Sequence, residues 1–173
     1  MRTTLKYLWL MTLIAALVGL VACSDDDDND NNGNNNPGTP DPWEGTWLSA
    51  GTDVAPILVA FAGNDSIRVT FNADQTVLLE SHVPASGWST QGGIYTFTEN
   101  DGSDILTVHI EYTNPNFTQD GIMQIWTASP DSMYLEAVQT DPDIGATPLT
   151  YDQGFGADPA LGILNIQKYR KVD

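Results

Sequence analysis

The chain has two imidazole bases, His82 and His109, and each has a glutamate two residues away. Glu80 precedes His82, and Glu111 follows His109. In an extended strand, residues two apart point to the same face, so each pair is placed for a proton relay or for half of a metal site. Solvated cross-strand partners give the same pattern, and the apolar residues that alternate with both pairs favour this second interpretation.

Sequence motifs for catalysis are lacking. The chain contains no G-x-S-x-G elbow, no H-E-x-x-H pair and no phosphate-binding loop. Carboxylate pairs of the glycosidase type would be the remaining route to catalysis. We therefore predict a protein that is not an enzyme and that uses no cofactor.

Two acidic stretches match a calcium loop only in part. Asp28, Asp30, Asn32 and Gly33 fit its first half, but Thr39 stands where a bidentate glutamate is needed. The acids at positions 141, 143 and 152 have a glycine and an alanine at 145 and 146, where an oxygen ligand and a glycine are needed. We predict no metal site.

The N-terminal sequence is typical of an export signal. Arg2 and Lys6 precede an apolar run over 8–22, roughly fifteen residues, which is too short to span a bilayer as a helix. The run ends in Leu-Val-Ala-Cys, which resembles the bacterial lipobox and predicts a signal peptide over 1–22 and lipidation of Cys23. Cys23 is also the one cysteine of the chain, so it has no partner for an intrachain disulfide.

A polar tether follows the lipidation site. Ser24 and the four aspartates at 25–28 resemble the signal that sends lipoproteins of Bacteroidota-type bacteria to the outer face of the outer membrane. Residues 23–42 combine the lipidated cysteine with repelling acids, asparagines and prolines, which predicts an extended, disordered tether over 24–42. The predicted location is the outer membrane, facing the cell exterior.

One domain is expected over 43–173. It carries 17 acids and four bases, a net charge of about −13. Binding to nucleic acid needs clustered cations, so this balance argues against a nucleic-acid partner.

Within the domain, apolar and polar residues alternate between turns, as in antiparallel strands. The expected strands are 45–50, 66–71, 76–83, 93–99, 105–112, 121–129, 133–140 and 163–172. Eight such strands are enough to close an all-β, up-and-down barrel and remove exposed edges. Residues 56–61 are apolar without alternation, which is compatible with a short helix plugging one end.

Two sequence features resemble the lipocalins and their calycin-like relatives. Trp43-Glu-Gly-Thr-Trp47 is similar to the G-x-W motif that opens those barrels. The stretches FNADQTV at 71–77 and WSTQGGIY at 88–95 are similar to segments of lipocalin-like lipoproteins from Bacteroidota. The resemblance implies that Trp47 packs across the barrel floor and that the barrel encloses a ligand cavity.

The long connection over 139–162 is the predicted ligand-binding region, because connections of this length are usually functional or disordered. It carries Tyr151 and Phe155, and with Trp88 and Trp126 these aromatics are expected to contact a small apolar ligand or a glycan fragment. The alternative is that Phe155 caps the barrel and that the tryptophans belong to the core.

Two functions therefore remain for a lipid-anchored barrel. One is a binding module for a small molecule or a glycan fragment. The other is a structural lipoprotein that docks onto a larger outer-membrane complex. Ser66 and Ser132 lie in Asp-Ser-hydrophobic triplets that resemble the O-glycosylation signal of exported Bacteroidota proteins, but the sequence does not decide whether they are modified.

Overall fold

The computed structural model of the protein describes residues 39–173. The predicted signal peptide, Cys23, the export signal and the tether up to residue 38 lie outside the described residues. The described elements are strands β1 (Gly45–Ala50), β2 (Ser66–Phe71), β3 (Thr76–Val83), β4 (Gly87–Asn100), β5 (Ser103–Thr113), β6 (Phe117–Trp126), β7 (Ser132–Asp141) and β8 (Gln167–Lys171), helix α1 (Pro56–Ala62), and the 3₁₀ turns η1 (Gly51–Asp53) and η2 (Gly162–Asn165).

The eight strands form one closed antiparallel barrel in sequence order. Each strand pairs with its sequence neighbours, and β1 pairs with β8 to close the ring, with Trp47 opposite Lys171. The predicted all-β, up-and-down barrel is therefore confirmed. Three strands differ clearly from the prediction: β4 begins at Gly87 rather than at 93, β6 spans 117–126 rather than 121–129, and β8 begins only at Gln167 because the preceding residues form η2.

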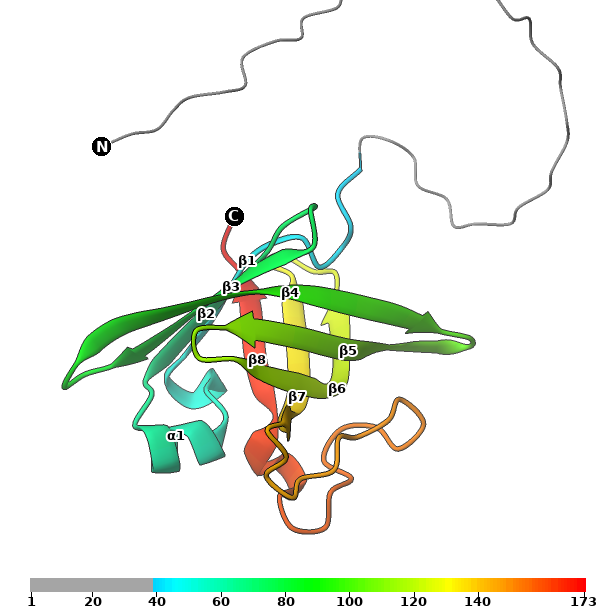
Figure 1. Cartoon of the computed structure of the whole chain (residues 1–173). Coiled ribbons are helices and arrows are strands. Elements are labelled where there is room, and N and C mark those ends of the chain that lie inside the picture. Colours follow the sequence, from blue (N-terminus) through cyan, green and yellow to red (C-terminus); the bar gives the residue numbers. More distant parts are fainter. Residues whose placement is uncertain (1–38) are drawn as a thin grey trace, which may run out of the picture. The chain divides into compact units, whose positions relative to one another are not determined.

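The apolar stretch after β1 forms the short helix α1. Pro56 occupies its first turn, where the missing N–H is no loss, and Gly63 ends it at φ 71°, a left-handed conformation that glycine adopts without strain. Figure 1 shows α1 and the connection after β7 at one end of the barrel, with the C-terminus at the opposite end. No helix within 39–173 is long and apolar enough to cross a membrane.

The end of the barrel away from α1 is filled by aromatic side chains. The Phe71 ring lies 5.0 Å from the Tyr95 and Phe97 rings, and Trp43 packs edge-on against Phe97. Trp47 is completely buried, and its Nε1 donates a hydrogen bond to the carbonyl oxygen of Trp43 (2.8 Å). Edge-to-face contacts of this kind add to the free energy of burying the rings.

Residues 142–161 connect β7 to η2 at the α1 end of the barrel, and part of this connection covers the outer face of β7. The Gly156 N–H donates to Glu136 Oε2 (2.8 Å), and the Phe155 ring packs against Tyr134, both on β7. Ile122 on β6 is fully buried although it alternates with the core residue Met123. This part of the barrel exterior is therefore covered rather than exposed to solvent.

Candidate ligand cavity

The barrel is hollow at the end that carries α1. A cavity of about 410 Å³ lies there, which is in the size range of sites for small molecules. Its wall combines inward-facing barrel residues with residues of α1, η2 and the connection after β7. The lining residues are Ile57, Leu58, Phe61, Asn64, Ile67, Val69, Leu79, Ser81, Tyr112, Gln119, Leu135, Ala137, Val138, Gln139, Ile144, Ala146, Leu161, Asn165, Gln167 and Tyr169.

Strand alternation explains which side chains reach the cavity. On β2, Ile67 and Val69 point inward and Arg68 points outward; on the neighbouring β3, Leu79 points inward and is paired with Val69. At the other end the Phe71, Tyr95 and Phe97 rings contact one another and fill the interior, whereas near α1 the inward aliphatic, polar and tyrosine side chains leave a space between them.

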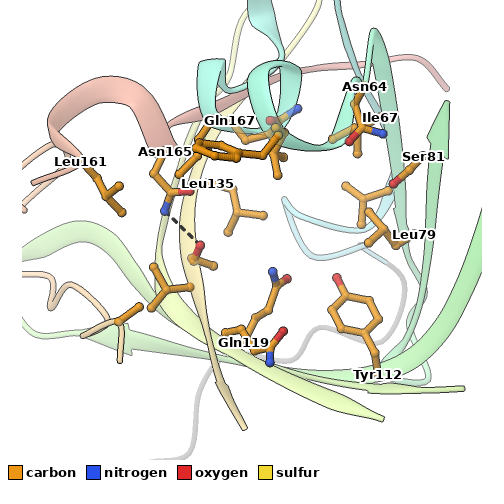
Figure 2. Close-up of a pocket in the computed structure, with 18 of the residues that line it drawn as sticks. Asn64, Ile67, Leu79, Ser81, Tyr112, Gln119, Leu135, Leu161, Asn165 and Gln167 are labelled. Atoms are coloured by element: carbon orange, nitrogen blue, oxygen red, sulfur yellow. Dashed lines mark hydrogen bonds between the residues drawn. The ribbon is translucent and has the colours of Figure 1, made fainter. Parts of the chain in front are cut away.

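A few polar groups interrupt the apolar wall. Asn165 Nδ2 donates to the Ala137 carbonyl oxygen (3.0 Å), and Asn64 Nδ2 donates weakly to the His82 carbonyl oxygen (3.4 Å). Figure 2 shows the Tyr112 hydroxyl pointing into the cavity. Burial raises the pKa of the Tyr112 hydroxyl, so this group stays neutral and keeps its proton at physiological pH.

A second hollow of about 650 Å³ lies along β3 to β6. Its lining includes backbone of Gly92 and Gly93 and two carboxylates, Glu111 and Asp141. Carboxylates are costly to cover with an apolar ligand because they must be desolvated. The cavity under α1 is the better candidate for an apolar molecule.

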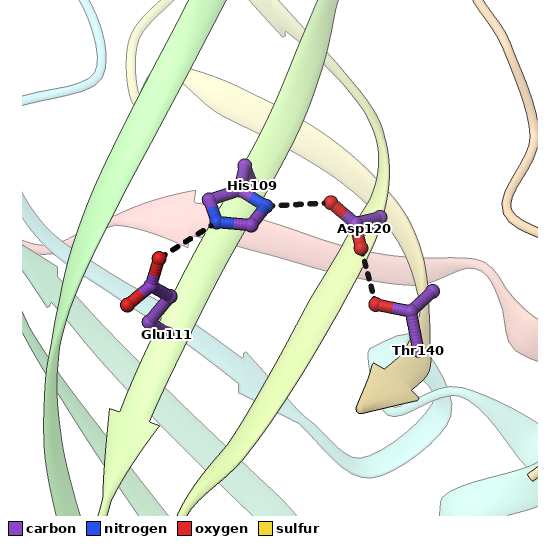
Figure 3. Close-up of polar contacts among 4 residues, drawn as sticks. All are labelled: His109, Glu111, Asp120 and Thr140. Atoms are coloured by element: carbon purple, nitrogen blue, oxygen red, sulfur yellow. Dashed lines mark hydrogen bonds and ion pairs between the residues drawn. The ribbon is translucent and has the colours of Figure 1, made fainter. Parts of the chain in front are cut away.

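His109 is held between two carboxylates on the outer face of the barrel (Figure 3). Protonated His109 donates from Nδ1 to Asp120 Oδ1 (2.7 Å) and from Nε2 to Glu111 Oε1 (3.1 Å). These two hydrogen bonds raise the pKa of the His109 imidazole, and the hydrogen bond to Asp120 contributes more than the one to Glu111. The Thr140 hydroxyl donates to Asp120 and not to His109, so no described nucleophile touches the imidazole. The predicted His109–Glu111 pair is present, as a solvated strand-to-strand network.

His82 has a different partner from the one considered in the sequence. Its Nδ1 lies 2.6 Å from Asp65 Oδ1, whereas Glu80 forms an ion pair with Arg68 across the strands (3.1 Å). Arg68 lies directly opposite Glu80 in the register of β2 and β3, and this favours the arginine as the partner. A His82–Glu80 relay is therefore not formed.

The four aromatics predicted to bind ligand lie outside the cavity. Trp88 stacks on the exterior against His82 and the Arg68 guanidinium. Trp126 and Phe155 both contact the Tyr134 ring, with centroids 4.8 and 6.0 Å away, and so form an aromatic group beside β7. Tyr151 is partly exposed. None of the four lines the cavity under α1.

Comparison of the chain with models of protein families, with curated proteins and with solved structures gave no match. The described residues also contain no group of three or more His, Cys, Asp or Glu side chains arranged to hold a metal ion. The site must therefore be interpreted from its own chemistry.

The residues of the cavity were not predicted from the sequence, although they leave a signal. Ser81, Gln119 and Gln167 fall at inward positions of their strands, where a filled barrel would place aliphatic residues. Polar residues on the inward face indicate a space or a polar partner there. This pattern is a weaker indication of a binding site than the aromatic residues of the 139–162 connection, on which the prediction was based.

Proposed function

We propose that this protein is a lipid-anchored binding module that holds a small, mainly apolar molecule in the barrel cavity under α1. The observation that supports this proposal is the cavity itself, with mainly apolar walls and a few convergent polar groups. Sites of this size and composition are typical of small-molecule binding. An eight-stranded up-and-down barrel is also the architecture of lipocalins, which supports the resemblance of the G-x-W region.

The membrane part of the proposal rests on Cys23 and its neighbours. A lipidated Cys23 followed by an acidic tether would hold the barrel at the outer membrane, facing the exterior. Labelling of growing cells with palmitate is expected to mark the protein, and Cys23→Ser is expected to abolish the label. An unlabelled native protein in the medium would exclude lipid anchoring, whatever the barrel binds.

Ligand uptake is tested by filling the cavity. N-phenyl-1-naphthylamine, a neutral apolar dye, is expected to bind and fluoresce. Leu79→Trp places a larger side chain in the cavity and is expected to weaken dye binding at least about tenfold, or about 1.4 kcal/mol.

The neighbouring Leu78 provides the matched control. It has the same side chain, but it points to the barrel exterior and is 40% exposed. Leu78→Trp is therefore expected to leave the affinity for the dye unchanged. Equal effects of the two substitutions, or no dye binding by the native protein, would contradict uptake in this cavity.

A second candidate function is docking onto a larger outer-membrane complex. It is favoured by exposed apolar side chains at the α1 end: Phe61 is 89% exposed, Ile163 74% and Ile144 63%. Exposed apolar patches often mark interaction sites. Ile163 does not line the cavity, so Ile163→Asp should release a docked complex from solubilised membranes without changing dye binding. A complex that survives Ile163→Asp would count against docking through this surface.

A further inference from the structure

The side chains that line the cavity under α1 carry no charge. The lining includes no Asp, Glu, Lys, Arg or His, although the domain holds 17 acids and four bases. Burial raises the pKa of the two lining tyrosines, Tyr112 and Tyr169, so both hydroxyls stay neutral at physiological pH. A charged ligand would find no partner for its charge in this space, and that is costly. The cavity is therefore suited to an uncharged molecule.

The polar side chains of the wall fall into two groups. The first group forms hydrogen bonds within the protein, to backbone atoms, and consists of Asn64, Gln139, Asn165 and Gln167. The side chains of the second group form no hydrogen bond with the residues of 39–173, and they are Ser81, Tyr112, Gln119 and Tyr169. The second group is the one that can offer hydrogen bonds to a ligand.

The tyrosine hydroxyls of the second group face the cavity. Tyr112 and Tyr169 are each only 4% exposed, but both hydroxyl oxygens keep some accessible surface. Figure 2 shows the Tyr112 hydroxyl pointing into the cavity. Gln167 Nε2 differs, because it is a buried atom without accessible surface and without a partner in the described part of the chain. A ligand can therefore reach the tyrosine hydroxyls but not the Gln167 amide nitrogen.

Three members of the second group gather on the side of the cavity away from α1. Tyr112 on β5 is paired with Phe117, two residues before Gln119 on β6, so Tyr112 and Gln119 are diagonal neighbours in the sheet and within reach of each other. Figure 2 shows both on the side opposite the helix. The Tyr112 hydroxyl also contributes to the raised pKa of Tyr169, which places the two phenols in the same region. We call Tyr112, Gln119 and Tyr169 the polar floor.

The opposite side of the cavity, next to α1, is mainly apolar. The helix contributes Ile57, Leu58 and Phe61 to the lining. Ser81 Oγ is a free hydroxyl on the wall between the polar floor and α1. A molecule that fills the cavity therefore meets free hydrogen-bonding groups at one end and apolar side chains at the other.

A purely apolar ligand would cover the polar floor and leave its hydroxyls and its amide without partners. Burying such groups unpaired costs free energy. A ligand hydroxyl or amide avoids this cost, because it can accept a hydrogen bond from a tyrosine hydroxyl and donate one to Gln119 Oε1.

We infer that the ligand is an uncharged amphiphile, with a hydroxyl or an amide at one end that lies against the polar floor and an apolar body that faces α1. The inference rests on the proposed ligand-binding function and adds the chemical class of the ligand and its orientation. It excludes carboxylates such as fatty-acid anions, and it also excludes amines that are protonated at neutral pH.

Four naphthalenes of similar shape test the ligand class by displacement of N-phenyl-1-naphthylamine from the native protein. 2-Naphthalenemethanol is expected to bind at least as tightly as 2-ethylnaphthalene, although its hydroxyl must leave water. 2-Naphthylmethylammonium and 2-naphthoate are expected to bind at least about tenfold more weakly than the alcohol, since their charges find no partner. A preference for the ethyl compound, or equal binding of either ion, would overturn the inference.

Removal of one hydroxyl tests the polar floor. Tyr112→Phe is expected to weaken binding of the alcohol about three- to tenfold and not to weaken binding of 2-ethylnaphthalene. Tyr95→Phe is the matched control: Tyr95 is 5% exposed, does not line the cavity, and donates its hydroxyl to the Asn72 carbonyl oxygen (2.8 Å). This control should leave both affinities unchanged. An equal loss in the two variants would overturn the role of Tyr112.

Two further variants test the orientation of the ligand. Gln119→Met keeps the length of the side chain and removes the amide, so it should lower the preference for the alcohol as Tyr112→Phe does. Ser81→Ala removes a hydroxyl nearer to α1 and should lower this preference less than Tyr112→Phe. A larger effect of Ser81→Ala would place the polar end of the ligand near α1 and overturn the orientation. If Tyr112→Phe does not fold, Gln119→Met and the four ligands on the native protein still decide the inference.

Failure of the inference differs from failure of the proposed function. A native protein that binds the dye but prefers 2-ethylnaphthalene, or accepts either ion equally well, still binds apolar molecules, and only the chemical class is wrong. A native protein that binds neither the dye nor any of the four naphthalenes overturns both the function and the inference.

Discussion

The two ends of the barrel are built from the same strands but are packed differently. At the end away from α1, the rings of Phe71, Tyr95 and Phe97 fill the interior. At the α1 end, other inward positions of the strands hold side chains such as Ile67 and Leu79, and a cavity remains. The difference indicates that closed packing at one end stabilises the barrel, while the other end is free to hold a molecule.

The largest effect is expected from breaking the filled end. Phe71 is 1% exposed and contacts two further rings, so Phe71→Ala removes a large apolar surface and leaves a void that its neighbours cannot fill. We expect the free energy of unfolding to fall by about 4 kcal/mol. Urea denaturation followed by tryptophan fluorescence measures this change. A loss below about 1 kcal/mol would show that the aromatic end is not the stabilising one.

A smaller effect is expected at the hollow end of the same strand. Ile67 also points inward but borders the cavity, so Ile67→Ala enlarges an existing space. We expect a loss of about 2 kcal/mol, the low end for this substitution. Ile110→Ala is the control, because Ile110 is fully buried and does not line the cavity; its loss should be larger. Equal losses would mean that the hollow end is packed as tightly as the rest.

The wall of the hollow end also carries a buried carboxylate on its outer side. Burial raises the pKa of Glu136, and the nearby Asp158 adds to the shift. Because the pKa is higher in the folded state, stability is lost as pH rises from the unfolded pKa, about 4.3, through the folded one, and it stays lost above both. Glu136→Gln avoids this loss and can still accept from the Gly156 N–H.

Thermal and urea unfolding of the Glu136→Gln variant measure the predicted gain. At about pH 7, it is expected to be more stable than the native protein by about 1 kcal/mol, and near pH 4 the difference should shrink. A variant that is less stable at both pH values would show that the carboxylate is needed in its charged form to hold the 142–161 connection.

The smallest effect is expected from the His109 network, which belongs to neither end. The pKa of His109 is raised by Asp120 and Glu111, so its contribution is present below the unfolded pKa, about 6.5, and is lost as pH rises through the folded pKa. His109→Gln should therefore destabilise the protein at about pH 5.5 and not at about pH 9. The side chains are partly exposed, so the loss should stay below about 1 kcal/mol.

A pH series of urea denaturation curves for native protein and His109→Gln tests this prediction. Constant destabilisation across the series would mean that the imidazole acts through packing rather than through its charge. Loss of dye binding in this variant would connect the outer network with the cavity, which the present arrangement does not predict.

The fold was largely predictable, because each strand needs only local alternation and a turn. The Ile67, Val69 and Phe71 series identified β2, and the apolar stretch before Gly63 identified α1. The start of β8 was placed too early, since the apolar residues of η2 continue the pattern of the strand. The predicted ligand residues Tyr151, Phe155, Trp88 and Trp126 do not line the cavity, because their position on the outside depends on how the barrel closes.

The sequence by itself determined the strand pattern and the overall negative charge, and it predicts lipidation of Cys23, since each depends on neighbouring residues or on composition. The tertiary structure alone decided which end of the barrel is filled and which is hollow. It also decided that the buried Gln167 side chain accepts a hydrogen bond from the Ala55 N–H and so connects β8 to the start of α1. These features depend on contacts between residues that are far apart in the sequence, 112 positions for Ala55 and Gln167, and local sequence patterns carry no record of such contacts.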